Sequence, residues 1–512
     1  MDFIKNNLAS VAWFRPELVL TAGVLALILL DVGWKKSPAR VAILTLAALA
    51  FFGGAAAMLA MQPSEGKSLF NGMIASDPFA TFFKWIFLAA GFLTVTIAAK
   101  AKEFGTNRLG VFYALLLSVV IGMCLMASAT DLLMLYLAVE MVSLPSYALV
   151  GYRPGDRKAI EASLKYVIYG GVASGIMLFG LSYIYGMTGS TSFAGLGAKL
   201  DDMMTGASVA GQAAGRMALV LSVIFVLCGI GYKIAAVPWH MWCPDVYEGA
   251  PTPFTAFLSV GPKAAGFALA IRMIYGALSS SAGAEGMSAG LSNLPWPAIV
   301  GILSAVTMSV GNLTAMNQTN LKRLLAYSSI AHAGYGLMGL AAASALGVQS
   351  IMIYMLIYLV MNLGAFLAVI VIAEATGGET VDDCKGLIRR HPLLAISFTI
   401  FLFSLTGLPP FAGFMGKWYL FAAILRRYGE AGGSWYIWLG IVAALNTAVA
   451  LYYYVRIIRA MIIDEPKGEI VVKPSLTYQV MLGAFSLAIL VFGLWWTPIA
   501  TWTEQSLTFF RG

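Results

Sequence analysis

The sequence predicts an all-α polytopic membrane protein with about 14 transmembrane helices. Of the 512 residues, 60% are hydrophobic and only 11% are charged, whereas about a quarter of the residues of a soluble domain carry charge. Apolar runs of about 20 residues, the length that spans a bilayer, recur along the chain. No polar stretch between them is long enough to fold separately, so we expect a single membrane domain.

The apolar runs divide the chain into a series of predicted spans. The first run, Leu18 to Leu30, is followed by Asp31 and a basic loop rather than by a small-residue cleavage site, so it is expected to remain as a helix. The predicted spans are 16–33, 40–60, 79–100, 108–128, 131–150, 159–187, 215–236, 252–279, 296–315, 323–343, 347–374, 393–426, 434–460 and 476–496.

The basic residues support this count and predict an orientation. Lys and Arg gather in the loops that follow the first, third, fifth, ninth, eleventh and thirteenth spans, and are sparse in the loops on the other side. Positively charged loops stay in the cytoplasm, so both termini are predicted on the periplasmic side of a bacterial inner membrane. The net charge of +8 is thus a topology signal and does not indicate nucleic-acid binding.

Cysteine and histidine are too dispersed to form a redox centre. Cys124, Cys228, Cys243 and Cys384 include no C-x-x-C pair, and the three histidines are equally scattered. We therefore expect no iron–sulfur cluster, haem, structural zinc or other cofactor in this chain.

Ionisable residues inside the predicted spans are the main candidates for function. Placing a charge in hydrocarbon costs about 3 kcal/mol or more, so such residues are rare and usually functional. Glu140, Lys233, Lys263 and Lys417 lie deep in their spans, and Lys165 lies nearer an end. For the deep residues the alternative is a static buried ion pair, but one acid cannot neutralise three lysines.

Lys84, Lys165 and Arg272 have a second interpretation. A long basic side chain near the end of a helix can extend its charge to the headgroup region. The sequence leaves this possibility and a functional role equally open for these three residues.

The chemistry of lysine suits a proton carrier. Burial disfavours the ammonium form, and a nearby carboxylate favours it again. If Glu140 approaches Lys233, the lysine is expected to hold a proton, and if Glu140 withdraws, to pass it on. Arginine could not do this, because it stays charged at any physiological pH.

Two of the lysines lie beside residues that break helices. Lys233 is five residues before Pro238, and Lys417 follows Pro409 and Pro410. Broken spans in corresponding positions of two halves indicate an ion site near the bilayer midplane, although each could be an ordinary proline kink.

The tenth span, YSSIAHAGYGLMGL, contains His332 among hydroxyl-bearing residues that could hold water and relay protons. A structural histidine is the alternative. The glycines at 334, 336 and 339 spell G-x-G-x-x-G without a preceding strand, so they predict close helix packing and not nucleotide binding.

At this point the residues resemble a known family. The stretch VPWHMWCPDVYEGAPTPFTAF, Val237 to Phe257, between Lys233 and Lys263, is similar to the antiporter-like membrane subunits of respiratory complex I, the NADH-quinone oxidoreductase. EASLKYVIYGG and LKRLLAYSSIAHAGYGLMGL also resemble that family, and the resemblance covers nearly the whole chain. The motif PDVYEGAPTP and the lysine at 417 resemble subunit N. Subunit M has glutamate at the position of Lys417, and subunit L is longer.

The resemblance implies two inverted five-helix repeats, each with a broken helix. It predicts the division 1–107 (helices 1–3), 108–280 (first repeat, helices 4–8), 294–462 (second repeat, helices 9–13) and 474–512 (helix 14). It also implies that this chain is one subunit of a proton-pumping translocase. NADH, FMN, iron–sulfur clusters and quinone would bind to other subunits, and the partners would be neighbouring antiporter-like and small membrane subunits, together with lipid.

The resemblance also implies roles for the candidate residues. Glu140 would be the modulating carboxylate and Lys233 the proton-holding lysine. Lys263 and His332 would form the central connection, and Lys417 the terminal donor on the exit side. Lys165 matches a family lysine.

Two other functions are weighed against this one. A subunit of a multi-subunit Na⁺/H⁺ antiporter would share the architecture and the buried lysines, but the wording of residues 245–253 favours complex I. A structural scaffold that has lost transport would require the deep lysines to be dispensable, which their insertion cost argues against.

Overall fold

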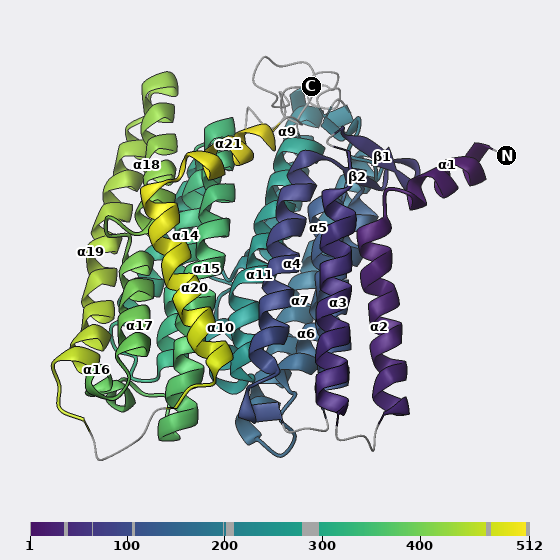
Figure 1. The fold of residues 1–512 in the computed structure, drawn as a ribbon. Coiled ribbons are helices and arrows are strands. Elements are labelled where there is room, and N and C mark those ends of the chain that lie inside the picture. Colours follow the sequence, from purple (N-terminus) through teal and green to yellow (C-terminus); the bar gives the residue numbers. More distant parts are fainter. Residues whose placement is uncertain are drawn as a thin grey trace.

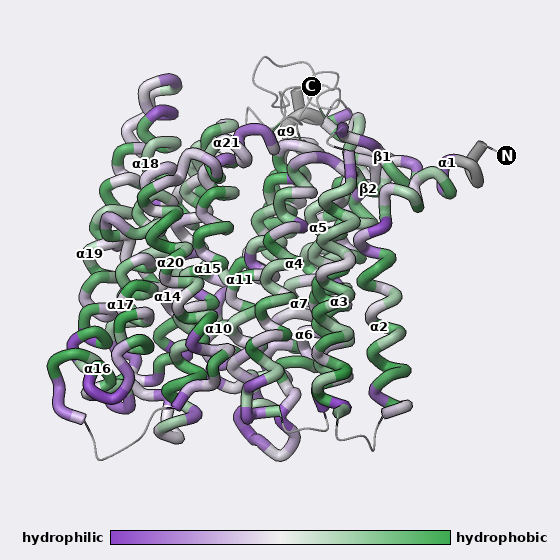
Figure 2. Tube along the Cα trace, viewed as in Figure 1, coloured by the Kyte–Doolittle hydropathy of each residue, from purple (hydrophilic) through white to green (hydrophobic). Residues whose placement is uncertain are grey.

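The chain folds as a bundle of long helices that run side by side (Figure 1). The computed structural model describes residues 2–34, 39–63, 65–104, 108–197, 199–200, 209–278, 296–466 and 473–507. Hydrophobic residues dominate the middle of the bundle and hydrophilic residues gather at its two ends (Figure 2). This distribution is that of a protein whose helices cross a membrane.

The N-terminal segment consists of four helices and a small hairpin. Its elements are α1 (Asp2–Val11), α2 (Arg15–Gly33), α3 (Arg40–Ala60), β1 (Lys67–Leu69), β2 (Ile74–Ser76) and α4 (Pro78–Ala98), with β1 and β2 antiparallel and Lys67 opposite Ser76. Asp77 caps α4 by accepting a hydrogen bond from the backbone N–H of Ala80 at 2.8 Å.

Two groups of helices follow. The first holds α5 (Leu109–Ser128), α6 (Leu132–Val150), α7 (Arg157–Thr188), α9 (Val209–Ile234), α10 (Trp242–Gly249) and α11 (Thr252–Ile271), which continues into a π-helical turn at Arg272–Ala277. The second holds α13 (Trp296–Ala315), α14 (Leu321–Ala341), α15 (Ala345–Thr376), α16 (Leu387–Arg390), α17 (Pro392–Thr406), α18 (Ala412–Ala431) and α19 (Ser434–Ile462). The chain then forms α20 (Leu476–Leu494) and α21 (Thr497–Gln505).

Twelve of the predicted spans are confirmed within the described residues. Twelve helices there are long and apolar enough to cross a membrane. The helix α14 and the broken pair α17–α18 occupy the two remaining predicted spans, 323–343 and 393–426, and are not among these twelve. The predicted interruptions are also present: α9 ends at Ile234, before residues 235–241, and α17 ends at Thr406, before residues 407–411.

The two groups of helices share local features that support the repeat. Each contains a 32-residue helix, α7 or α15, that ends at a glycine in the left-handed conformation, Gly189 or Gly377. Asp131, which caps α6, forms a bridge to Ser192 just beyond α7, and Asn320, which caps α14, forms a bridge to Thr380 just beyond α15. The predicted domain boundaries at 107, 280 and 294 lie outside the described residues.

The glycines of α14 allow close packing, as predicted. A Cβ on Gly334 would lie 2.6 Å from the backbone nitrogen of Met308 in α13, and one on Gly336 would lie 2.5 Å from the Phe267 ring in α11. Only glycine permits these approaches, so α14 packs tightly against α13 of its own group and against α11 of the first group.

Candidate functional site

Lys233 lies in the last turn of α9, where the helix stops, and its side chain is buried. Its Nζ donates a hydrogen bond to the hydroxyl of Ser143 in α6 at 2.8 Å. Glu140 is one helical turn before Ser143 and is half-buried, and its Oε1 has no hydrogen-bond partner in the described structure. The structure therefore places Glu140 and Lys233 near the same serine without an ion pair between them.

Lys263 joins the two groups of helices. It follows Pro262 in the fully buried helix α11, and its Nζ donates to both the carbonyl oxygen and the Oγ of Ser329 at 2.5 Å. Because Ser329 belongs to α14, this lysine links the first group of helices to the second.

His332 lies one turn beyond Ser329 and is also buried. Its Nδ1 contacts the hydroxyl of Tyr354 in α15, and its Nε2 lies 3.4 Å from the hydroxyl of Tyr454 in α19. The Tyr454 hydroxyl in turn shares a hydrogen bond of 2.5 Å with the Oγ of Ser328. His332 is thus surrounded by hydroxyl groups, but the two that contact its ring belong to tyrosines that the sequence analysis did not select, and of the neighbouring serines Ser328 is connected to it through Tyr454.

Lys417 is buried just after the break between α17 and α18. Its Nζ donates to the carbonyl oxygen of Thr406 at 2.7 Å and lies 4.3 Å from the centre of the Tyr335 ring. Thr406 is the last residue of α17, so its carbonyl has no helical partner, and the broken helix provides the acceptor.

The α14 helix connects these groups. Ser329, His332 and Tyr335 recur every third residue, which places them on adjacent turns of one face. Through them α14 contacts Lys263 at one end and Lys417 at the other. These contacts run from Lys263 to Lys417, and the Lys233–Ser143 contact lies beside them on α9 and α6. We call the whole set the buried polar axis and define it as Glu140, Ser143, Lys233, Lys263, Ser329, His332, Tyr335 and Lys417.

Lys165 lies outside this axis. Its side chain is 37% exposed and forms ion pairs with Glu161 at 2.7 Å and with Asp245 of α10 at 2.6 Å. The structure thus places this lysine in a charged network and not among the buried lysines.

Lys84 and Arg272 are both buried and paired with acids. The Lys84 side chain is 5% exposed and pairs with Glu17 of α2 at 2.7 Å. Arg272 is 3% exposed and pairs with Asp77 at 2.7 Å, while its Nε donates to the carbonyl of Ala127. Each is neutralised inside the bundle by an acid that the sequence analysis did not select.

Glu17 is the clearest residue that sequence reasoning missed. It occupies the first turn of α2 and is almost completely buried. A carboxylate at the edge of an apolar run is usually taken for a loop residue at the membrane surface. The signal that could have found it is the presence of Lys84 within another apolar run, since a buried ammonium needs an acid close to it.

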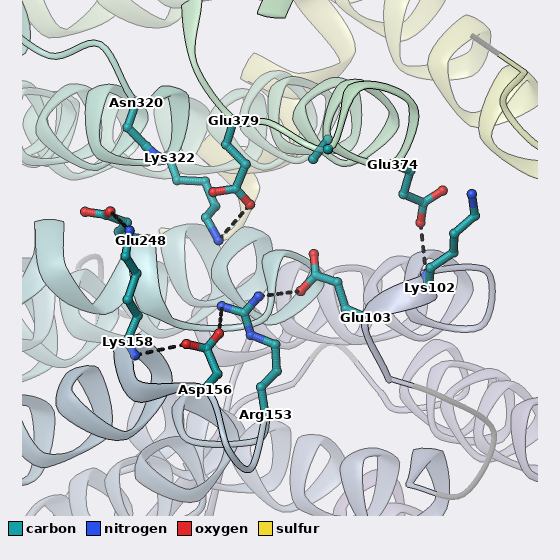
Figure 3. Close-up of a pocket in the computed structure, with 12 residues that line it drawn as sticks. Lys102, Glu103, Arg153, Asp156, Lys158, Glu248, Asn320, Lys322, Glu374 and Glu379 are labelled. Carbon is teal, nitrogen blue, oxygen red and sulfur yellow. Dashed lines mark hydrogen bonds and ion pairs between the residues drawn. The ribbon is translucent and has the colours of Figure 1, made fainter. Parts of the chain in front are cut away.

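Charged residues from distant parts of the chain surround a pocket at one end of the bundle. The pocket has a volume of about 560 Å³ (Figure 3). Lys322, whose side chain is 1% exposed, pairs there with Glu379 at 3.1 Å and donates to the carbonyl of Ala250 at 3.3 Å. Glu103 accepts a hydrogen bond from the backbone N–H of Thr252 at 2.9 Å. The N-terminal segment and both groups of helices therefore meet at this end.

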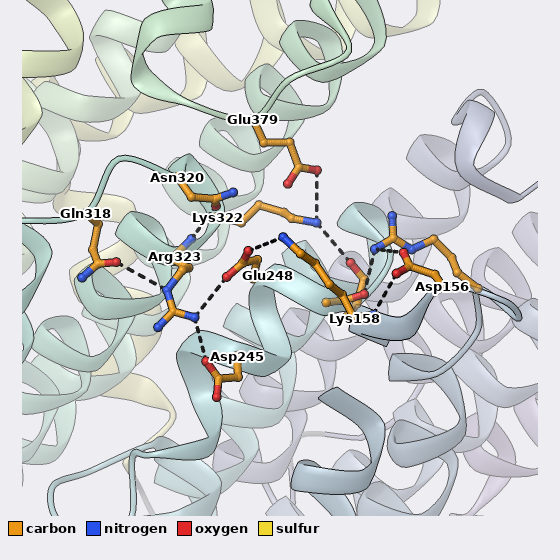
Figure 4. A network of polar contacts seen from close by, with 12 residues as sticks. Asp156, Lys158, Asp245, Glu248, Gln318, Asn320, Lys322, Arg323 and Glu379 are labelled. Carbon is orange, nitrogen blue, oxygen red and sulfur yellow. Dashed lines mark hydrogen bonds and ion pairs between the residues drawn. The ribbon is translucent and has the colours of Figure 1, made fainter. Parts of the chain in front are cut away.

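A network of ion pairs beside the pocket holds the short helix α10 (Figure 4). Asp245 binds Lys165 and Arg323, and Glu248 binds Lys158 and Arg323. Burial alone would raise the pKa of Asp245, but the hydrogen bonds and charges of Lys165 and Arg323 outweigh it and lower the pKa. For Glu248, Lys158 and Arg323 likewise outweigh burial and lower the pKa.

This network should not titrate in the physiological range. A carboxyl group whose pKa is lowered by folding stabilises the fold above its ordinary pKa, and this contribution is lost only as the pH falls through the lowered value, below about pH 4. We therefore expect Asp245→Asn to lower the melting temperature of the assembled complex by the same amount at pH 6 and at pH 8. A difference that disappears between these two pH values would contradict the assignment.

The fold and the axis together define a multi-pass membrane subunit of the antiporter-like, ion-translocating class. Residues 129–445 match the family described as NADH:quinone oxidoreductase/Mrp antiporter. The chain is 63% identical to NADH-quinone oxidoreductase subunit N of Anaeromyxobacter sp. (strain Fw109-5), over 100% of this chain and 99% of the relative. A subunit N of Sorangium cellulosum is 43% identical over 99% of both chains. The chain belongs to this family, and within it to the N subunits of NADH-quinone oxidoreductase.

Solved structures agree with this assignment. A chain of respiratory complex I from Thermus thermophilus is 30% identical, covers 95% of this chain and 98% of its own length, and superposes with a TM-score of 0.75. A chain of the Mrp complex from Dietzia sp. has a TM-score of 0.78 at 21% identity, with 96% of each chain covered, and so shows the shared fold alone. The protein is therefore a proton-translocating, multi-pass membrane subunit of a respiratory complex, and the antiporter alternative is less well supported.

Proposed function

We propose that this subunit moves protons along its buried polar axis, from Lys233 through Lys263 and His332 to Lys417, with Glu140 as the modulating carboxylate. The observation that carries the proposal is the set of partners of the three lysines. Each hydrogen-bonds only neutral oxygens in the described structure: the Ser143 hydroxyl, both oxygens of Ser329 and the Thr406 carbonyl.

Neutral partners leave the lysines free to change their charge. A buried ammonium that is paired with a carboxylate, like that of Lys84, is held in its charged form. Among the described residues, no acid forms an ion pair with the three axis lysines, so the low-dielectric surroundings favour release of the proton. Their serine and carbonyl partners can still accept a hydrogen bond from the protonated form. This balance permits both protonation states.

Glu140 can change this balance at Lys233. Its carboxylate is one turn from the serine that Lys233 contacts, and its Oε1 has no hydrogen-bond partner among the described residues. A closer approach would favour the ammonium form of Lys233, and withdrawal would favour transfer of the proton towards Lys263. Lys165 lies outside the axis, and we propose that it acts on the axis through its ion pair with Asp245.

The proposal includes an orientation in a bacterial inner membrane. α1 and α21 lie at one end of the bundle, whereas α16 and the loop between α6 and α7 lie at the other (Figure 1). The second end carries the basic loops, so it would face the cytoplasm, and both termini would face the periplasm.

Electron transfer takes place elsewhere in the complex. NADH, FMN and the iron–sulfur clusters belong to other subunits, and the partners of this chain are the other membrane subunits. Energy from that reaction would reach this chain as a change in charge or hydration along the axis.

Replacing Lys233 with alanine in the native organism tests the function. We expect NADH–quinone turnover and proton pumping to fall together, by about tenfold or more, in a complex that still assembles, because the first proton-holding amine is removed. Both are measured in membrane vesicles. Lys385→Ala is the control, since Lys385 pairs with Asp382 at 2.8 Å outside the axis. Normal pumping in the Lys233 variant would refute the role, and loss of Na⁺ tolerance with normal respiration would favour the antiporter.

A further inference from the structure

The short helix α10 is tied to both of its neighbours by charge. Towards α7, Asp245 pairs with Lys165 at 2.6 Å and Glu248 pairs with Lys158 at 2.8 Å. Towards α14, both acids pair with one guanidinium nitrogen of Arg323, at 2.7 and 3.0 Å (Figure 4). Among the described residues, Arg323 is the basic residue that touches both acids of α10.

The opposite face of α10 reaches the buried axis. Tyr247 lies between Asp245 and Glu248 in the sequence, and its side chain is completely buried. Its hydroxyl lies 3.4 Å from the Oγ of Ser329, the same oxygen that accepts a hydrogen bond from Lys263. A separation of 3.4 Å is at the long limit for a hydrogen bond between hydroxyl groups, so a small shift of α10 relative to α14 would break it.

The same two helices are therefore joined on both faces of α10, and the Sγ of Cys243 also contacts the carbonyl oxygen of Ala326 at 4.0 Å. Arg323 is in the first turn of α14 and Ser329 is six residues further along the same helix. Arg323 binds the outer face of α10, and Ser329 contacts its inner face through Tyr247. Both the Arg323 ion pairs and the Tyr247–Ser329 contact therefore bear on how α10 lies against α14.

We propose that Arg323 is a positioning residue for proton transfer at Lys263. By holding Asp245 and Glu248 against α14, it keeps the Tyr247 hydroxyl on Ser329, and so keeps the Ser329 oxygens oriented for the Lys263 amine. Arg323 itself does not touch the lysine and, because its guanidinium keeps its proton, it takes no part in proton transfer. This inference rests on the proposed role of the axis.

Three substitutions distinguish a positioning role of Arg323 from a general effect of losing a charge at this end of the bundle. Arg323→Gln removes the charge that ties α10 to α14, whereas Arg323→Lys keeps a charge that can still reach one acid. Lys158→Gln is the matched control, because it breaks an ion pair of the same helix with Glu248 on the α7 side, where Lys158 is 70% exposed. We expect pumping per NADH oxidised to fall several-fold in Arg323→Gln, to recover largely in Arg323→Lys, and to stay at the wild-type level in Lys158→Gln.

A double-mutant cycle tests whether Arg323 acts through Tyr247. Tyr247→Phe removes only the hydroxyl, and it should lower pumping even if Arg323→Gln fails to assemble. In a variant with both changes, the loss should be no larger than the greater single loss, since both act on one contact. Multiplied losses, or normal pumping in Tyr247→Phe, would overturn the proposal.

Lys263→Ala separates this inference from the function on which it rests. If Lys263→Ala pumps normally, the proposed axis is wrong. If Lys263→Ala is inactive while Arg323→Gln pumps as well as Lys158→Gln, the axis stands and only the positioning role fails.

Discussion

Replacing Lys417 with arginine should stop proton translocation as completely as replacing it with methionine. Within the part of the chain that the structure describes, Lys417 contacts the Thr406 carbonyl and the face of Tyr335, and the proposed role requires its amine to lose and regain a proton. Methionine keeps the length of the side chain without a charge, and arginine keeps a charge that it cannot release. We expect pumping to fall by about a hundredfold, corresponding to about 2.7 kcal/mol in the barrier, in both variants.

The measurement is proton uptake or release by membrane vesicles during NADH oxidation, with the amount of assembled complex determined in parallel. Lys385→Arg and Lys385→Met serve as controls, because the Lys385 side chain is 30% exposed. If the arginine variant of Lys417 pumps well and the methionine variant does not, a fixed positive charge is sufficient at this position and the lysine is not a proton carrier.

Replacing Glu17 with alanine should strongly destabilise the N-terminal helices. The change leaves the Lys84 ammonium buried without its acid, at a position where the two side chains are 1% and 5% exposed. Breaking one partner of a buried ion pair costs about 3–5 kcal/mol. We expect a lower melting temperature of the solubilised complex and less assembled subunit in the membrane.

A paired substitution separates charge from packing. Glu17→Leu combined with Lys84→Met removes both charges and keeps the volume, so it should restore most of the lost stability. Glu430→Ala is the control, because Glu430 pairs with Arg426 at the surface, where such a pair is worth about 1 kcal/mol or less. A single Glu17 variant as stable as the Glu430 variant would contradict the importance of the buried pair.

Much of the fold could be predicted because the signals are local. A run of apolar residues reports a span wherever it occurs, and the breaks at residues 235–241 and 407–411 were predicted from Pro238, Pro409 and Pro410. The glycines of α14 likewise predicted close packing. The deep lysines were found because a charge in an apolar run stands out without knowledge of its neighbours.

The partners of these charges could not be predicted. Glu17 is 67 residues from Lys84, and Arg323 is 78 residues from Asp245, so no local pattern connects them. The same limit explains why Lys84 and Arg272 were equally compatible with extension to the headgroups. Whether a basic residue in a span is neutralised or left with neutral oxygens depends on which helix packs beside it.

The sequence by itself determined which residues enter the membrane, where two helices break, and which family the chain resembles, because hydropathy, proline and motif wording belong to short stretches of chain. Only the tertiary structure decided which lysines have an acid and which do not. Lys84 pairs with Glu17, and Lys165 pairs with Asp245 and Glu161. The other three lysines donate hydrogen bonds to hydroxyl and carbonyl oxygens: Lys233, Lys263 and Lys417. The free energy of a buried charge depends on the atoms around it, and those atoms come from helices that only the packed bundle brings together.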